Sequence, residues 1–256
     1  MSKRAAVVAV SCGALLAGCG SGASAETDEV VSHLVEAGLP ADDIRVADGA
    51  VYLGGDAHVS LDASREMLKP GEGHHELHRT INLVGPNVTR ICVNPTAVFN
   101  AYNRLSQGLD LALANYNALG LRLHFVRGPT TGCTATITVT TTAGAGSSAG
   151  YPSNGLPYGH IYVGTGLSSY SLDRAEHAIT HAIGHTIGLR HTDHFDPSIS
   201  CGTTIPGPEG SGGIGFIPIP GMPPPSPGGS IMNTCIPPDT DGEFTPSDIA
   251  GLNYLY

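Results

Sequence analysis

The chain has 256 residues and a formal net charge of −10, with 12 Lys and Arg residues against 22 Asp and Glu residues. This acidic balance argues against a nucleic-acid-binding protein, because phosphate recognition requires an excess of basic side chains. The hydrophobic fraction of 41% excludes general disorder, and no apolar run reaches the roughly 20 residues of a membrane span. The length allows one domain with a sizeable core, or one domain with a small attachment.

The first 18 residues have the pattern of a secretory signal, in which Lys3 and Arg4 precede an apolar stretch. The run Leu16-Ala17-Gly18-Cys19 resembles the bacterial lipobox, whose cysteine receives a lipid and becomes the new N-terminus. A cut after Ala25 is the alternative, and it would release a soluble protein. We therefore expect an exported protein, either anchored through Cys19 to a membrane of a bacterial envelope or secreted, with residues 19–26 as a tether.

Residues 27–68 are expected to form a small pro-segment-like region before the main body. Apolar residues at helical spacing predict a short amphipathic helix over residues 27–37, and Gly38 stops it. Residues 44–60 alternate loosely around an Asp-Gly turn, which predicts a hairpin. The stretch 69–78 is interpreted as a linker, with its histidines solvated rather than forming a second metal site: His74, His75 and His78.

The main body, residues 79–256, mixes helical and strand patterns. A long amphipathic helix is expected over residues 95–119 and a second one over 173–189. A last short helix begins after Thr245, its N-cap. Strands are expected at residues 89–93, 121–126, 135–142 and 159–164, a Gly/Ser loop at 143–157 and a Pro/Gly-rich excursion at 196–229.

Four cysteines remain after the leader, an even number that fits disulfides in an oxidising compartment. Three pairings are open, and we prefer Cys92–Cys133 with Cys201–Cys235 because each pair lies within one half of the body. The second bridge would stabilise the fold by roughly 3–4 kcal/mol on the chain-entropy model. A Cys-rich metal site is disfavoured, because the sequence has no Cys-x-x-Cys spacing.

The stretch 181–191, His-Ala-Ile-Gly-His-Thr-Ile-Gly-Leu-Arg-His, carries the chemistry. His181 and His185 lie one turn apart on one face of a helix, a spacing that suits one tetrahedral Zn²⁺. His191 would point about 240° away on a continuing helix, so it can join them only if the helix ends. Gly188 allows that ending, since glycine adopts positive φ without steric cost. Three imidazoles then hold the metal and leave a fourth position open, as in catalytic zinc sites.

This motif resembles the metzincin zinc motif, and the residues around it resemble the dual-action HEIGH metallopeptidases. Ser230-Ile231-Met232-Asn233 resembles the Met-turn, whose Met232 would form an apolar floor under the zinc ligands. The resemblance implies an α+β fold with a twisted mixed β-sheet, a zinc-binding helix, a Met-turn and a C-terminal helix. It also implies Zn²⁺, a peptide or protein substrate and peptide hydrolysis, with the strand at 159–164 lining the cleft. We expect the protein to be a monomer.

One departure from the family concerns catalysis, because Ala182 stands where the family has a glutamate. That glutamate takes a proton from zinc-bound water and passes it to the leaving amine, which alanine cannot do. Its loss typically lowers the rate by ~10²–10⁴. Glu176 lies about 140° around the helix from the first ligand and cannot replace it from there. Thr234 stands where astacins place a tyrosine, so an oxyanion donor is not evident either.

Two functions of different class therefore stay open. In the first, the chain is a secreted zinc endopeptidase with weak activity or with a base that the sequence does not identify. In the second, it is a zinc-binding pseudopeptidase that holds peptide in its cleft without cutting it. An engineered Ala182 is a third explanation, and the retained signal sequence argues against it.

Two aspartates have roles that depend on the fold. Leu53-Gly54-Gly55-Asp56 is similar to a part of astacin pro-segments in which the aspartate takes the fourth zinc position and holds the enzyme latent. The alternative for Asp56 is an ordinary Gly-Gly-Asp turn. Asp193 is interpreted as a residue that orients a zinc ligand through a hydrogen bond. Asp239 and Asp241 lack the pattern of a Ca²⁺-binding loop.

Overall fold

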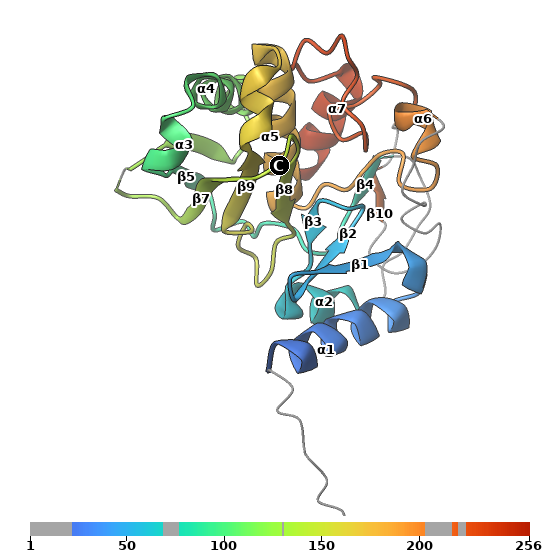
Figure 1. Ribbon diagram of the computed structural model, residues 1–256. Helices are drawn as coiled ribbons and strands as arrows, with labels where there is room; N and C mark the ends of the chain where they lie inside the picture. The colour runs from blue at the N-terminus through green and yellow to red at the C-terminus, as the bar shows by residue number, and fades with distance from the viewer. Residues whose placement is uncertain (1–21, 69–76, 130, 203–216, 220–223) are drawn as a thin grey trace, which may run out of the picture.

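The computed structural model describes residues 22–68, 77–129, 131–202, 217–219 and 224–256, and Figure 1 shows their arrangement. The predicted signal sequence, Cys19, His74 and His75 lie outside these residues. The elements mix helices and strands, which confirms the predicted α+β class. Within the described ranges, no helix combines the length and the apolar character needed to cross a membrane.

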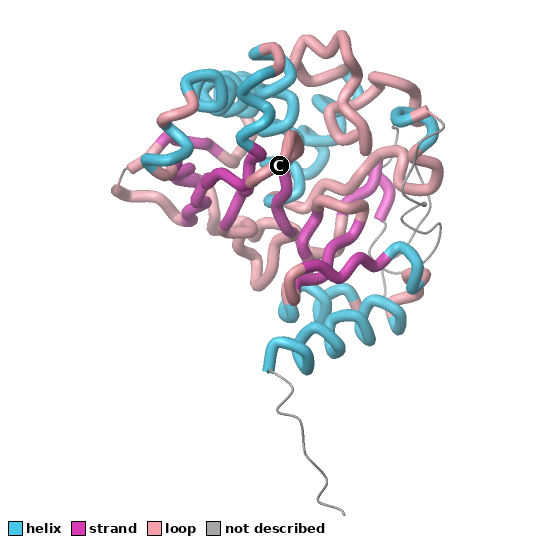
Figure 2. Tube along the Cα trace, in the orientation of Figure 1, coloured by secondary structure: helices cyan, strands magenta, loops and turns pink. Residues whose placement is uncertain are grey.

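Eight strands form one twisted mixed sheet (Figure 2). Its order is β1-β2-β3-β8-β9-β7-β5-β6, and the strands β9, β7, β5 and β6 run parallel to one another. β8 runs antiparallel to β9, and β3 runs parallel to β8. The strands are Ile44–Ala47 (β1), Ala50–Leu53 (β2), Ala57–His58 (β3), Arg90–Pro95 (β5), His124–Arg127 (β6), Ala135–Thr142 (β7), Ser147–Gly150 (β8) and His160–Gly164 (β9).

Two long helices, α4 (Asn103–Ala118) and α5 (Leu172–Thr186), pack against each other beside the sheet. Their apolar faces and the inner side chains of β5, β7 and β9 form the main core. The single helix expected over residues 95–119 is divided, because Tyr102 leaves helical backbone angles with φ −92° and ψ 91°. The first piece is the short α3 (Ala97–Asn100). The last helix, α7 (Pro246–Leu255), begins after Thr245 as expected, with a capping box.

The N-terminal region has a small core of its own, formed by α1 (Gly22–Glu36), β1, β2, β3 and α2 (Leu61–Met67). Helix α1 begins at Gly22, so residues 22–26 are helical and do not form the expected tether. The hairpin turns at Asp48 and Gly49, whose φ angles of 51° and 78° suit a two-residue turn. Helix α2 lies where the sequence predicts no helix. Its signal is the N-cap Ser60, whose hydroxyl accepts a hydrogen bond from the Ala63 amide at 3.2 Å.

The remaining short elements lie in segments expected to be irregular. Strand β4 (Leu77–Arg79) pairs antiparallel with β10 (Ile217–Ile219), so residues 77 and 78 belong to a strand and not to a linker. Strand β8 lies within the expected loop at 143–157, and β10 lies within the excursion at 196–229. The remaining elements are η1 (Ala41–Asp43), η2 (Thr165–Ser169) and α6 (Ser198–Cys201). The two preferred disulfides are both present, Cys92–Cys133 and Cys201–Cys235.

The close crossing of α4 and α5 depends on Gly108. A Cβ atom there would lie 3.0 Å from the backbone N of Glu176 and 3.1 Å from the carbonyl C of Ala175. We predict that Gly108→Ala lowers the free energy of unfolding by about 1–3 kcal/mol in urea titrations, because the backbone of α5 cannot move aside. The loss should occur although alanine is the better helix former.

The matched control is Ala114→Gly at an exposed position of the same helix. This change should cost about 1 kcal/mol from helix propensity alone. A gain in stability for Gly108→Ala would contradict the close approach of the two helices.

Candidate metal centre

Helix α5 carries two of the histidines predicted as metal ligands into the interior of the protein. The helix begins at the N-cap Ser171, and His181 and His185 are 4% and 0% exposed. Because the two residues are one turn apart, both imidazoles lie on the same face of the helix. Their Nε2 atoms are 2.9 Å from each other.

His191 reaches the same point because the helix ends in time. Gly188 adopts φ +104° and turns the chain back toward α5. A Cβ atom at this position would lie 2.6 Å from the carbonyl O of Asn82, so the site requires glycine for space as well as for φ. After the turn, Nε2 of His191 lies 3.1 Å from Nε2 of His181.

Hydrogen bonds on the outer ring nitrogens orient the two helical imidazoles. Nδ1 of His181 donates to the carbonyl O of Ile231 and Nδ1 of His185 donates to that of Leu189, both at 2.9 Å. Since a neutral imidazole carries one proton, each Nε2 is left with a lone pair. Burial lowers the pKa of His185 and favours this neutral form, although Asp56 acts to raise that pKa. The lone pairs converge at a distance that favours a shared cation between them.

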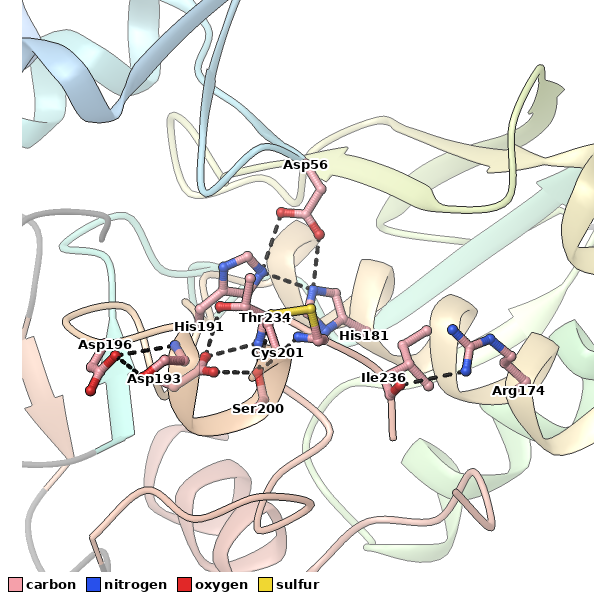
Figure 3. Close-up of a disulfide and its surroundings, with 12 residues drawn as sticks. Asp56, Arg174, His181, His191, Asp193, Asp196, Ser200, Cys201, Thr234 and Ile236 are labelled. Carbon is pink, nitrogen blue, oxygen red and sulfur yellow. Dashed lines mark hydrogen bonds and ion pairs between the residues drawn. A yellow bond between two sulfur atoms is a disulfide. The ribbon is translucent and has the colours of Figure 1, made fainter. Parts of the chain in front are cut away.

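Asp56 completes the group from the N-terminal region (Figure 3). Its Oδ2 lies 3.1 Å from Nε2 of His181, and its Oδ1 lies 3.2 Å from that of His191 and 3.5 Å from that of His185. Oδ1 is buried and has no hydrogen-bond partner. The four ligand atoms lie within 4.8 Å of one another, and three imidazoles with one carboxylate are a donor set of tetrahedral Zn²⁺. The residues present therefore fit the metal, which would satisfy the orphaned oxygen.

The Asp56 carboxyl group is held in its ionised form. Burial raises its pKa, but the three imidazoles that face it lower the pKa well below its usual range, because any proton on the ring nitrogens nearest the carboxylate favours the ionised form. The ionised form is the one that binds a metal ion.

The backbone around Asp56 covers the edge of the sheet beside the metal centre. In the β3–β8 pair, the Ala149 amide donates to the Asp56 carbonyl at 3.1 Å, and the Tyr151 amide donates to the His58 carbonyl at 3.3 Å. Strand β9, expected to line the cleft, lies one strand further in, between β8 and β7. This corrects the expectation: β8 is the strand next to the site, and its Ser-Ser-Ala-Gly sequence gives little strand signal.

Met232 lies under the zinc helix. It is 1% exposed, and a Cβ atom on Gly184 would lie 2.5 Å from its Sδ, so the thioether packs where α5 has no side chain. Asp248 of α7 holds this segment by accepting the Ile231 amide at 2.9 Å and the Ser230 hydroxyl at 2.5 Å. These bonds position the carbonyl of Ile231 that orients the first imidazole.

Ala182, the position of the missing glutamate, is fully buried. It lies one turn after Ala178, whose carbonyl accepts the hydroxyl of Ser147 in β8 at 2.7 Å. The Ala182 methyl group therefore lies on the side of α5 that β8 covers. Among the residues that the structure describes, Asp56 is the one carboxylate in the ligand cluster.

Asp193 is buried and connects two neighbouring segments. Its Oδ1 accepts hydrogen bonds from the amide and the hydroxyl of Thr234, both at 2.8 Å, and its Oδ2 accepts the Ser200 hydroxyl. The disulfide between Cys201 and Cys235 joins the same two segments (Figure 3). The side chain thus anchors the stretch that follows the Met-turn.

Three contributors to this site were not identified from the sequence. The carbonyls of Ile231 and Leu189 orient the imidazoles through backbone atoms that every residue has, so no residue type marks them. Arg174 lines a cavity that also contacts His181 and Asp56. Its signal is the spacing, because residues seven apart lie on nearly the same face of a helix.

The geometry predicts one zinc ion per chain, with His185 as a ligand. His185→Ala should lower the affinity for zinc by at least 100-fold, because three ligands remain and the Leu189 carbonyl loses its donor. Zinc content after dialysis against a chelator, measured by mass spectrometry, checks this. His160→Ala, at an exposed position of β9, is the matched control and should keep one zinc ion.

Glu176 on α5 predicts a pH-dependent stability. Its carboxylate accepts a hydrogen bond from Asn115 at 2.8 Å, but burial raises its pKa from 4.5 to about 7. The folded protein then holds the proton more tightly than the unfolded chain, so stability falls as pH rises from about 4.5 to about 7. We expect Glu176→Gln to raise the free energy of unfolding by about 1–3 kcal/mol at pH 8 and to change it little at pH 4.5.

Thermal unfolding across this pH range measures the difference between variant and parent. Glu243→Gln removes a nearby exposed carboxylate and serves as the control. An equal gain for Glu176→Gln at both pH values would mean that the effect does not come from ionisation.

The family model of the dual-action HEIGH metallo-peptidases matches residues 51–256. The match begins at Val51, so it includes Asp56 as well as the three histidines. No curated protein matches the chain.

Solved structures with some similarity include two of myroilysin and one hatching enzyme. One myroilysin structure is 16% identical over 70% of this chain and 98% of that chain, with a TM-score of 0.45. Another is 20% identical over 41% of this chain and 45% of that chain, with a TM-score of 0.31. High choriolytic enzyme 1 (HCE-1), a hatching enzyme zinc-protease from Oryzias latipes (Medaka fish), is 13% identical over 68% of this chain and 92% of that chain, with a TM-score of 0.37. Because the family model spans most of the chain together with its metal centre, this chain belongs to the dual-action HEIGH metallopeptidase family, and its cofactor is Zn²⁺.

Proposed function

We propose that this chain is an exported, zinc-dependent peptide-binding protein of the metallopeptidase type, whose hydrolysis is weak or absent. We propose further that its own N-terminal region keeps the cleft closed. The observation that carries the proposal is the double contact of residues 56–58. The carboxylate of Asp56 faces the three imidazoles, while the backbone of the same stretch pairs with β8.

A bound peptide would need both of these places. Extended peptides bind such sites by adding a strand to a free sheet edge, and a scissile carbonyl must reach the metal. Strand β3 occupies the edge, and Asp56 occupies the side of the metal centre opposite the imidazoles. The N-terminal region therefore excludes peptide by taking the position of a substrate in both respects.

The chemistry at the site supports binding better than turnover. Zinc, when bound, would polarise water and a peptide carbonyl. The protein side lacks a group at residue 182 that could carry a proton between them, because the methyl group of Ala182 has no titratable atom. The Thr234 hydroxyl donates to Asp193, so it is not directed at a developing negative charge. We infer a rate some 10²–10⁴ below that of the same site with a glutamate.

Two disulfides support export, because such bridges persist in oxidising compartments. A lipid on Cys19 would hold the protein at a membrane of the envelope, and a cut after Ala25 would release it. Attachment through Cys19 stays a prediction, which mass spectrometry of the natural protein's N-terminal peptide would test.

The proposal predicts how two substitutions combine. We expect full-length Asp56→Ala and Ala182→Glu chains, each loaded with zinc, to cleave a fluorogenic peptide mixture slowly or not at all. The double variant should cleave at least ~100-fold faster than Asp56→Ala, because it has both an open site and a general base. Initial rates with matched zinc content measure this.

The control replaces Ala182 by Gln in the Asp56→Ala background, which adds the same volume without a carboxylate. It should show no gain in rate. If Asp56→Ala alone cleaves within tenfold of the double variant and a chelator stops it, the chain is an active peptidase with another base. If the Ala182→Glu chain cleaves as fast as the double variant, residue 56 does not close the site.

A further inference from the structure

A cavity of about 420 Å³ opens beside the metal centre. Four parts of the chain form it: the segment around Asp56, the start of β8, the cleft side of α5 and the stretch after the Met-turn. Figure 3 shows Arg174 and Ile236 next to His181, on one side of the imidazoles. A peptide bound at the metal would place the side chain of a neighbouring residue in this space.

Among the described residues that line the cavity, Arg174 provides the one permanently cationic side chain. It lies seven residues before His181, about 20° around the helix from it, so both residues face the cleft. Its Nη1 lies 3.5 Å from the Ile236 carbonyl, a long contact, and its Nε is buried without a hydrogen-bond partner. Its guanidinium also lies over the Tyr170 ring, with the central carbon 4.9 Å from the ring centroid. No ion pair joins it to a carboxylate of the described residues.

The other polar side chains of the cavity wall already donate their protons elsewhere. The Ser147 hydroxyl donates to the Ala178 carbonyl, and the Thr234 hydroxyl donates to Asp193. The guanidinium is thus the donor left for an occupant, and its planar fork fits a carboxylate through two hydrogen bonds. Asp56 also lines the cavity, and its carboxylate offsets the guanidinium charge while the cleft is closed. Once the N-terminal region has moved away, Arg174 leaves the cavity positive in a chain with a net charge of −10.

We propose that Arg174 makes the cavity select a carboxylate on the peptide residue next to the metal. The carboxylate is either an acidic side chain or the free C-terminus of a short peptide. The inference rests on the proposed function, because it assumes that the opened cleft binds peptide beside zinc. A neutral or basic group in the same place would leave the buried guanidinium nitrogen unpaired or add a repulsive charge.

The test uses hydroxamate peptides, because a hydroxamate chelates zinc and fixes which side chain lies beside the metal. Three compounds have an amidated end and differ only in the first side chain, which is Glu, Gln or Lys. A fourth compound has Gln there and a free carboxylate one residue on. Their dissociation constants are measured on zinc-loaded, full-length Asp56→Ala protein. The same set is then measured with Arg174→Gln, Arg174→Lys or Arg174→Glu added.

We expect the Glu compound to bind at least tenfold more tightly than the Gln compound, and Arg174→Gln to reduce this ratio below twofold. Arg174→Lys should keep part of the preference, and Arg174→Glu should favour the Lys compound. Arg90→Gln, which removes an exposed charge on β5, should change no ratio. If the Gln compound with a free carboxylate binds more tightly than the amidated Gln compound, while the Glu compound does not, the carboxylate that Arg174 selects is a peptide C-terminus.

The two proposals fail in different ways. If all four compounds bind equally well and only with zinc, the cavity has no carboxylate preference and the proposed function still stands. If none binds although the protein contains one zinc ion, both proposals are overturned. Equal zinc content and equal thermal stability of the Arg174 variants exclude misfolding as the cause of a lost preference.

Discussion

The metal centre depends on two hydrogen bonds between imidazole N–H groups and backbone carbonyls. They leave the lone pairs of His181 and His185 directed at one point, and a cation is needed there to offset their repulsion. One carbonyl belongs to Leu189, just beyond the Gly188 turn. The other belongs to Ile231, whose amide is bound by Asp248.

Asp248 connects this arrangement to the C-terminus of the chain. The same carboxylate forms the capping box that begins α7 and holds the segment beneath the zinc helix. The end of the chain, the Met-turn and the first ligand are therefore parts of one hydrogen-bonded unit. A substitution in the N-cap of α7 would therefore shift the backbone of Ile231, and with it the imidazole of His181 that the Ile231 carbonyl orients, although no ligand residue is changed.

Local patterns predicted those parts of the fold that local interactions determine. The helical period indicated that His181 and His185 share a face, and the glycine at 188 indicated how His191 joins them. The residue pattern of β7 and the N-cap of α7 also depend only on neighbouring residues, and both elements were expected at the positions where the structure has them. The resemblance to pro-segments directed attention to Asp56, which residue pattern alone would leave in an ordinary turn.

Features that depend on residues far away in the sequence could not be predicted from local patterns. Strand β8 consists of Ser, Ala and Gly, and it is a strand because β9 and β3 lie on either side of it. The division between α3 and α4 interrupts a continuous apolar stripe, so periodicity does not reveal it. The orienting carbonyls have no residue type at all. Sequence thus identified the residues that meet in the cluster, and the three-dimensional structure was needed to find what orients and covers them.

The N-terminal region is attached to the body by more than the chain itself. Tyr151 of the body is part of its core, and Asn82 donates to the Ala63 carbonyl and to Glu66. A break between α2 and β4 would therefore turn one polypeptide into a complex of two, still held by these contacts. The high effective concentration given by the covalent link would be lost. The cut alone would not open the cleft; the cleft would open when the severed region is diluted or when a competing peptide displaces it. In a confined space such as a cell envelope, the severed region would rebind and the cleft would stay covered.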